Sequence, residues 1–399
     1  MLGKIDLPPA FGPAQLSDAL ARRCTDVLCH ASMFGLVDAL YLAHTLFSVA
    51  RRYERGKSMR ARFLGPCVAL ALLVSGSGAW AQSTPATPAT DAQSIATLNE
   101  QAANGDAKAQ FELGMDYQNG LDMPLDYPQA AIWFRKAAEQ GNAEAQNGLG
   151  DLYYMGWGVP KDYAKAAIWY RKAAEQGNAE AQFNLGLLYD NGIGVPLDYS
   201  QAAAWNRKAA EKGSAAAQFT LGVLYEKGHG VEQDFAQAAT WYRKAAEQGN
   251  ESAQQNLGVL YLNGEGVPQN FAQAATWFRK AAGQGLPVAQ TNLGVLYEEG
   301  RGVPHDYVLA ATWYRKAAEQ GNAEAQADLG FAYGKGHGVP QDYAEEYFWL
   351  DLGLSGQLPE RADAEKVRNA AASLLTPAML SRVQERARKW FEDHPAKVQ

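Results

Sequence analysis

Three histidines are the first residues in this sequence whose type suggests chemistry. His229 and His337 both lie in a Gly-His-Gly motif, and His305 lies in another loop between them. A shared metal ion would need both imidazole nitrogens within about 2.1 Å of it. Three copies of a 36-residue repeat separate His229 from His337, which amounts to six helix layers of roughly 9 Å each. We therefore expect these histidines in solvated loops and predict no metal site.

Carboxylates are plentiful, and Asp190 or the adjacent Glu298 and Glu299 could be imagined as acid–base groups. General acid–base chemistry also needs a partner group at a fixed position. The sequence offers no nucleophile motif, Ser/His/Asp set, phosphate-binding loop or metal-ligand spacing beside these residues. We predict no catalytic residue, no cofactor and no metal ligand.

Residues 59–81 have the parts of a secretory signal peptide in the usual order. A basic start is followed by an apolar run over residues 63–74 and by an Ala-Trp-Ala cleavage motif. The apolar run is too short to span a bilayer. We expect cleavage after Ala81, a periplasmic or secreted protein, and no integral membrane segment in the mature chain. For residues 1–58, translation that starts at Met59 and an extended leader both stay open.

A repeat of 36 residues dominates the rest of the chain. Seven copies fill residues 105–356 without insertion, and each begins at a glycine: Gly105, Gly141, Gly177, Gly213, Gly249, Gly285 and Gly321. The Trp, Tyr and Gln that recur in every copy cannot mark a unique active site, so we interpret them as structural. Candidate functional residues must come from the positions that vary between copies.

Each copy is typical of two helices. In the third copy, Ala181, Leu185 and Tyr189 form one apolar stripe at helical spacing. Gly192 and Gly194 then end this first helix, because only glycine adopts a positive φ freely.

The second helix of the third copy is predicted to start at an N-cap, Asp198, with Gln201 completing a capping box. Its buried side is predicted to alternate small and large residues, Ala202, Trp205 and Ala209.

The motifs Leu-Gly-x-x-Tyr, Gly-x-Gly-Val-x-x-Asp, Ala-x-x-Trp and Lys-Ala-Ala at this period resemble the Sel-one-like repeat (SLR) family, relatives of the tetratricopeptide repeat. The resemblance covers residues 105–356. It implies an all-α fold, a right-handed superhelical solenoid of antiparallel helix pairs with a concave binding face. It also implies adaptor or scaffold roles for other proteins, in bacterial envelopes, signalling or host contact. Some cysteine-rich members are associated with β-lactamase-like activity, but all three cysteines here precede residue 82.

The two ends of the array are predicted to be capped, since terminal repeats must hide their apolar faces. Residues 82–90 are expected to be a disordered linker and residues 91–104 an N-terminal capping helix. Two capping helices are expected over 357–399, the second with Thr376 as its N-cap. An inward stripe on that helix consists of Leu380, Val383, Ala387 and Trp390.

The first helices should line the concave side, and the positions that vary there form a candidate groove for a protein partner. Its residues are Phe183, Leu187, Asp190, Phe219, Val223, Glu226, Gln255, Val259, Leu262 and Glu298. Its apolar middle and acidic side chains favour a protein or peptide segment with apolar anchors and a few Lys or Arg. Leu187, Val223, Val259 and Val295 could equally pack between successive first helices. Trp157 is a second anchor candidate, with a packing role as the alternative.

The net charge of −7 argues against nucleic acid as a partner, because a basic face is expected there. The sequence favours a monomeric, non-catalytic adaptor of the bacterial envelope. Two alternatives stay open, a secreted factor that engages a host protein and a hydrolase acting on β-lactams or cell-wall fragments.

Overall fold

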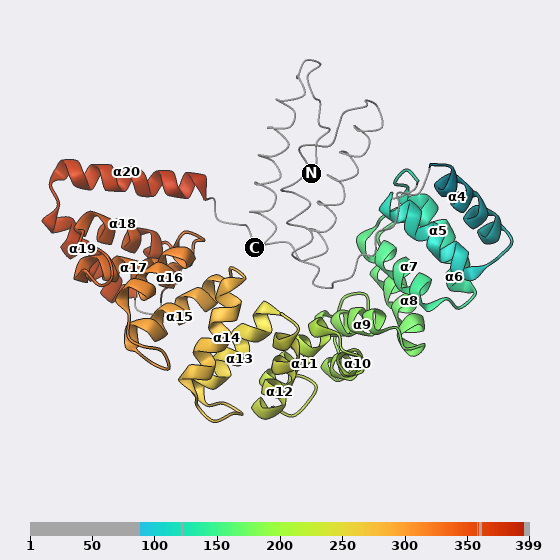
Figure 1. The fold of residues 1–399 in the computed structure, drawn as a ribbon, viewed down its shortest axis with the longest axis horizontal. Helices are drawn as coiled ribbons and strands as arrows, with labels where there is room; N and C mark the ends of the chain where they lie inside the picture. The colour runs from blue at the N-terminus through green and yellow to red at the C-terminus, as the bar shows by residue number, and fades with distance from the viewer. Residues whose placement is uncertain (1–87, 121–122, 357, 359–360, 395–399) are drawn as a thin grey trace, which may run out of the picture. The chain divides into compact units, whose positions relative to one another are not determined.

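The structure, a computed structural model, describes residues 88–120, 123–356, 358 and 361–394. All elements of this described part are α-helices, α4 to α20, which confirms the predicted all-α repeat solenoid (Figure 1). The chain divides into two compact units, residues 1–137 and 138–399. No helix of the described residues is long and apolar enough to cross a membrane. The predicted signal at 59–81 and residues 1–58 lie outside the described residues.

The helices alternate as the repeat predicts. The first helices are α5 (Ala107–Asn119), α7 (Ala143–Met155), α9 (Ala179–Asn191), α11 (Ala215–Lys227), α13 (Glu251–Asn263), α15 (Pro287–Glu299) and α17 (Ala323–Lys335). The second helices are α6 (Tyr127–Glu139), α8 (Tyr163–Glu175), α10 (Tyr199–Glu211), α12 (Phe235–Glu247), α14 (Phe271–Gly283), α16 (Tyr307–Ala318) and α18 (Tyr343–Leu354). Helix α4 (Pro88–Ala103) precedes them, and α19 (Arg361–Leu374) and α20 (Pro377–Asp393) follow. In the second unit, successive helix pairs lie side by side in chain order (Figure 1).

Helix α4 begins at Pro88, three residues before the predicted start at residue 91. The last three residues of the expected linker 82–90 are therefore helical. Proline is tolerated in the first turn of a helix, where its missing N–H has no intrahelical partner in any case. The rest of that linker lies outside the described residues.

The predicted N-cap of the second helix is confirmed, but the capping box is wrong. The Asp198 carboxylate accepts hydrogen bonds from the backbone N–H groups of Ser200 and Gln201. The backbone N–H of Asp198, which a capping box would pair with the Gln201 side chain, instead donates to the carbonyl of Tyr189. The turn from the first helix therefore already satisfies this donor.

The two loop glycines have different tasks. Gly192 has a φ of 64° and ends α9 in the left-handed conformation, as predicted. Gly194, with a φ of 69°, lies against the preceding repeat: a Cβ there would be 2.4 Å from the carbonyl oxygen of Tyr163. The second glycine therefore also sets how closely one loop approaches the start of the previous second helix.

Within a repeat the two helices meet at a glycine. A Cβ on Gly258 of α13 would lie 2.5 Å from the ring of Phe278 on α14, and Phe278 is fully buried. The residue after the tryptophan is thus the one that packs against this glycine. The predicted stripe is wrong at Trp205, which is half-buried while Asn206 is buried, although the equivalent Trp241 and Trp277 are buried.

Successive repeats are joined by a buried hydrogen bond. The Gln218 side chain of α11 donates from Nε2 to the carbonyl of Ala210, 3.0 Å away at the end of α10. Gln248 then donates to Gln218 Oε1 at 2.7 Å. The same bond to a carbonyl eight residues earlier recurs from Gln110, Gln146, Gln182, Gln254, Gln290 and Gln326.

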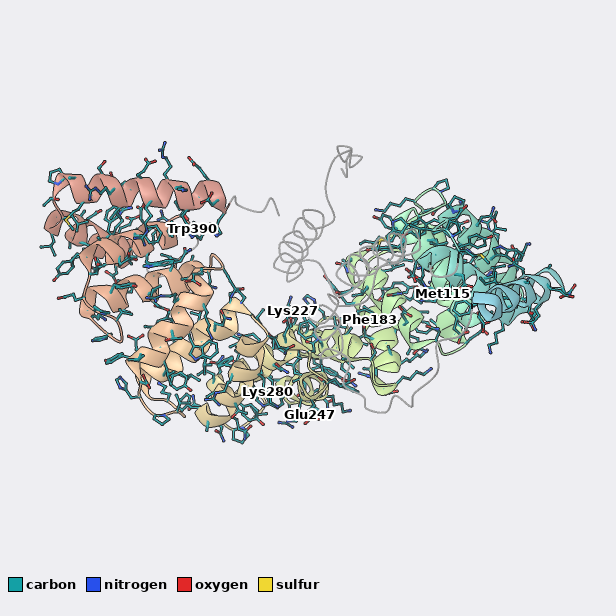
Figure 2. The ribbon with its side chains drawn as sticks, turned by 45° about the horizontal axis from the view of Figure 1, so that its top comes forward. Met115, Phe183, Lys227, Glu247, Lys280 and Trp390 are labelled. Carbon is teal, nitrogen blue, oxygen red and sulfur yellow. The ribbon has the colours of Figure 1, made fainter. Side chains whose placement is uncertain are left out.

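The C-terminal helices cover the last repeat. Thr376 accepts a hydrogen bond from the backbone N–H of Met379 and begins α20, as predicted. Val383 and Ala387 are buried, and Leu380 and Trp390 pack against the same apolar cluster of α16–α18. Trp390 lies on the side of α20 that faces the array (Figure 2). The predicted inward stripe is therefore confirmed.

We expect the Gly258→Ala substitution to lower the free energy of unfolding by about 1–3 kcal/mol, because the new methyl group would overlap the Phe278 ring. Gly283→Ala is the matched control. Nothing lies within 4 Å of a Cβ there, so this helical alanine should stabilise by about 0.5–1 kcal/mol. Urea unfolding followed by circular dichroism measures both, and equal midpoints would contradict the close packing.

Candidate functional site

The candidate groove residues lie on the first helices α9, α11, α13 and α15 and are mostly half-buried. Phe183 packs against the apolar cluster around Ala217 and Leu221 of the next repeat. Phe219 contacts the ring of Tyr242, with centroids 5.8 Å apart. Both phenylalanines thus fill space between helices while one part of each ring stays exposed.

The aliphatic groove residues behave in the same way. Leu187, Val223, Val259 and Leu262 are half-buried, and the last three pack against core clusters. Gln255 is only 8% exposed, and its Oε1 accepts no hydrogen bond from the described residues. The groove floor is therefore apolar, with one amide oxygen left for another donor.

The acidic groove residues are tied to tyrosines that the sequence analysis missed. The Tyr314 hydroxyl donates to Glu298 Oε2 at 2.6 Å, and that of Tyr242 donates to Glu226 Oε2. Each of these tyrosines follows the conspicuous tryptophan of its second helix. The signal was in the sequence, since this position varies between repeats and its hydroxyl would need a partner once buried.

A third such pair lies on α7 and α8. The Tyr170 hydroxyl donates to Asp151 Oδ1 at 2.7 Å. Asn184 of α9 donates from Nδ2 to the same oxygen at 3.4 Å and to Asn147 Oδ1 at 3.3 Å. Burial raises the pKa of Asp151 to about 7, partly offset by the Tyr170 hydrogen bond and reinforced by Glu180.

Burial also raises the pKa of Asp190, while electrostatic interactions with His229 and Lys227 lower it. Asp190 thus lies near two basic side chains of the next repeat. Asp190 and Glu226, half-buried at the ends of α9 and α11, place their charges at helix C-termini, where the helix dipole is unfavourable for an anion.

The two helix layers of the second unit differ in charge. The first helices α7 to α17 carry the acidic residues Glu144, Asp151, Glu180, Asp190, Glu226, Glu251, Glu298, Glu299, Glu324 and Asp328. The cations within these fully described helices are Lys227 and Lys335. Each second helix from α8 to α16 instead carries an Arg-Lys pair. Figure 2 shows Lys227 and, on the opposite side of the ribbon, Glu247 and Lys280 of the second helices.

The cations of the second helices serve structural contacts. Arg243 donates from Nη2 to the hydroxyl of Tyr261 at 2.7 Å. Lys244 holds its ammonium 3.9 Å from the centre of the Trp241 ring, an i,i+3 contact. Both contacts recur in neighbouring repeats. The acidic residues of the first helices have no comparable set of cations on their own layer.

His305 is exposed in its loop, as predicted, whereas His229 and His337 are half-buried, which corrects the prediction for these two. The His229 ring contacts the Tyr199 ring, with centroids 4.4 Å apart and planes tilted by 31°. His305 and His337 both contact Tyr307, at 4.3 and 3.9 Å. In the loops, His229 and His337 therefore pack on the first aromatic residue of the preceding second helix. Among the described residues, no group of three or more His, Cys, Asp or Glu is placed to hold a metal ion.

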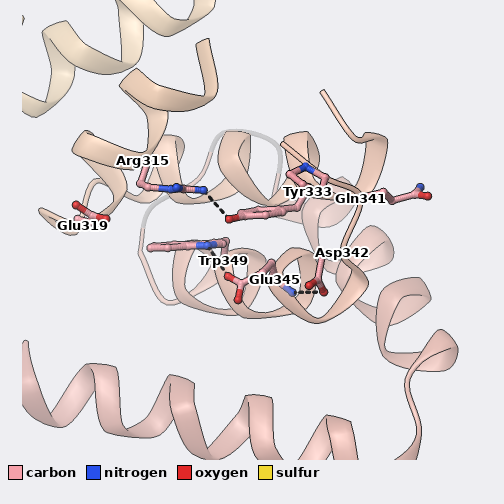
Figure 3. A pocket seen from close by; sticks show the side chains of 8 residues that line it. Arg315, Glu319, Tyr333, Gln341, Asp342, Glu345 and Trp349 are labelled. Atoms are coloured by element: carbon pink, nitrogen blue, oxygen red, sulfur yellow. Dashed lines mark hydrogen bonds between the residues drawn. The ribbon is translucent and has the colours of Figure 1, made fainter. Parts of the chain in front are cut away.

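Two of the cavities in the second unit lie close to residues discussed above. One of about 480 Å³ lies between α16 and α18, where Arg315 donates to the Tyr333 hydroxyl and Trp349 donates to Glu345 (Figure 3). The other, of about 420 Å³, includes Leu262 of the candidate groove together with Val295. This second cavity therefore adjoins the predicted groove. Trp157 is half-buried in its loop.

A family model of the Sel1 repeat matches eight segments of the chain: 107–142, 143–178, 179–214, 215–250, 251–286, 287–322, 323–351 and 370–392. The eighth match falls on α19 and α20, which the sequence analysis interpreted as caps alone. The chain matches no curated protein.

Two solved structures are similar to the chain. A Sel1 repeat protein from Oxalobacter formigenes is 37% identical, with a TM-score of 0.55 over 71% of this chain and 82% of that chain. The protein c5321, a protective antigen of uropathogenic Escherichia coli that displays an SLR fold, is 32% identical, with a TM-score of 0.38 over 77% and 83%.

We expect Asp151→Asn to change how stability depends on pH. The folded-state pKa of about 7 lies above the ordinary aspartate value of 3.8, so the folded protein binds this proton more tightly and wild-type stability falls as pH rises between those values. The asparagine still accepts from Tyr170 but carries no charge. At pH 8 the variant should be more stable by roughly 1–3 kcal/mol, and at pH 4 the two should be alike.

Thermal unfolding at pH 4 to 8 measures this difference. Glu144→Gln removes an exposed carboxylate from the same helix and should leave the pH profile unchanged. If the stability of Asp151→Asn and of the wild type changed with pH in parallel, burial would not be what raises the pKa of the Asp151 carboxyl.

Proposed function

The chain belongs to the Sel1 repeat family, and we propose that it binds a protein or peptide segment along its first helices. Proteins of this family are generally non-catalytic protein-interaction scaffolds. The partner that we propose carries apolar anchors and a few lysines or arginines. The groove residues named above, from Phe183 to Glu298, would form its contact surface.

The observation that carries this proposal is the charge of the first-helix layer. Its acidic residues line an apolar floor, whereas the basic residues of the second helices are tied to tyrosine and tryptophan. A basic segment would be attracted to this layer over a distance and then held by contacts with the apolar floor.

Half-burial of Phe183 and Phe219 supports the same surface. The exposed part of each ring can add area to an interface without a large loss of side-chain entropy, because both rings are already held by the packing beneath them. Aromatic residues in such positions often dominate binding energy.

We propose that the protein acts without catalysis and without a cofactor. The three tyrosine–carboxylate pairs bridge the two helices of a repeat. In each pair the carboxylate accepts the hydrogen bond that the buried tyrosine hydroxyl needs. They are better explained as structural links beneath a binding surface than as acid–base groups.

A random dodecapeptide library tests the proposed function. Wild-type protein should select peptides that combine apolar residues with Lys or Arg. A Phe183→Ala/Phe219→Ala variant and a Glu226→Gln/Glu298→Gln variant should each bind them about tenfold more weakly, equivalent to 1.4 kcal/mol. The glutamines keep an acceptor for the tyrosine hydroxyls.

The matched control is Lys244→Ala/Lys280→Ala on the second helices, which should bind the same peptides as wild type. Circular dichroism confirms that each variant is folded. Selection of no peptide, or equal affinity of all variants, would refute binding on the first-helix layer.

We also propose that the protein is exported to the periplasm or beyond the cell, on the strength of the signal motif at 59–81. Mass spectrometry of the protein isolated from the native envelope or medium should give a chain that begins at Gln82. A mature chain that retains residues before Gln82 would overturn the predicted cleavage site.

A further inference from the structure

Glu346 of α18 is a buried acidic residue that makes no ion pair with any of the residues that the structure describes. The residue is only 7% exposed. Its carboxylate forms no hydrogen bond or ion pair with the described residues, and Lys335, the nearest cation in sequence to the adjoining Gly334, is exposed to solvent. Burial raises the pKa of this carboxyl.

The last repeat exchanges two residues relative to its predecessor. In the sixth repeat the first helix carries Glu298 and the second helix carries the buried Ala310. At the equivalent positions 36 residues later, the first helix carries Gly334 and the second helix carries Glu346. The third and fourth repeats follow the sixth, with Asp190/Ala202 and Glu226/Ala238.

The exchange keeps a carboxylate at the contact between the first and second helices of the repeat. A Cβ on Gly334 would lie 2.0 Å from Glu346 Oε1, so the carboxylate reaches the backbone of α17 where a side chain would otherwise begin. In the fourth and sixth repeats the acidic side chain comes from the first helix. In the seventh it comes from the second helix, through the space that glycine leaves.

An alanine fills this position in the earlier repeats, so packing alone does not call for a glutamate. Burial of most of this glutamate without a counter-charge costs free energy in the unbound protein, and that cost is offset if a ligand supplies the opposite charge. The half-exposed Gly334 has no side chain that would block the approach.

We propose that Glu346 is an anchor site for a lysine or arginine side chain of the partner that lies on the first helices. This proposal rests on the proposed function and extends the contact surface by one repeat beyond Glu298. The cationic group enters beside Gly334 and pairs with the Glu346 carboxylate. A buried, charge-paired contact of this kind fixes the register of a segment along a repetitive surface.

The test is a double-mutant cycle with the tightest-binding library peptide as the probe. Each Lys or Arg of that peptide is replaced in turn by norleucine, and every peptide is titrated against wild type and Glu346→Gln. We expect Glu346→Gln to weaken binding of the parent peptide about tenfold, which corresponds to 1.4 kcal/mol. One norleucine peptide should bind both proteins equally, because its missing cation is the one that Glu346 holds.

Two controls separate binding from folding. Glu346→Gln should unfold at a higher temperature than wild type at pH 8 and at nearly the same temperature at pH 4, because it removes a buried charge. Weaker binding by a more stable protein cannot be explained by misfolding. Glu324→Gln, which removes an exposed carboxylate from α17, should bind the parent peptide as wild type does.

The outcomes also separate the two proposals. If peptides are selected but Glu346→Gln binds all of them as tightly as wild type, the anchor site is wrong and the binding face stands. If Glu346→Gln weakened the binding of every norleucine peptide equally, this would likewise exclude a specific pair between Glu346 and one cation of the peptide. If wild type selects no peptide at all, both proposals fail.

Discussion

The register of the array depends on one hydrogen bond that is repeated at every junction between helix pairs. A buried glutamine amide of each first helix donates to a carbonyl in the last turn of the preceding helix. The same carbonyl also accepts a hydrogen bond from the backbone N–H of the glycine that opens the repeat. The bonded residues are eight apart in the chain. An insertion between them would leave the buried glutamine N–H group unpaired, at a cost of about 1–3 kcal/mol.

That bond explains why the surfaces can vary while the scaffold does not. The glutamines, the helix-facing glycines and the aromatic rings make the contacts within and between repeats. The remaining positions of the first helices are then free to carry acidic and apolar residues, and those of the second helices to carry basic ones. A rigid array with one acidic layer suits recognition of a basic segment, because the charges are held in place before the partner arrives.

The last repeat departs from this division in a way that the capping helices make possible. Helices α19 and α20 cover α18, which buries Tyr347, Phe348 and Trp349. The second helices from α8 to α16 instead carry an Arg-Lys pair shortly after their tryptophan. With its packing supplied from that side, α18 can carry Glu346 toward α17 instead of an alanine. Departures from a local rule tend to mark functional sites in otherwise consistent structures.

The repeat, the helix pairs, their glycine turns and the caps could all be predicted from the sequence, because local periodicity and backbone preference recur in every copy. The acidic and apolar character of the first helices could be predicted as well. Which neighbour each side chain meets depends on how the helices pack. The residue after the tryptophan packs against the helix-facing glycine, His229 and His337 contact tyrosine rings, and Glu346 occupies the space left by Gly334. These pairs join residues on different helices, and their distances depend on packing that no single-helix pattern contains.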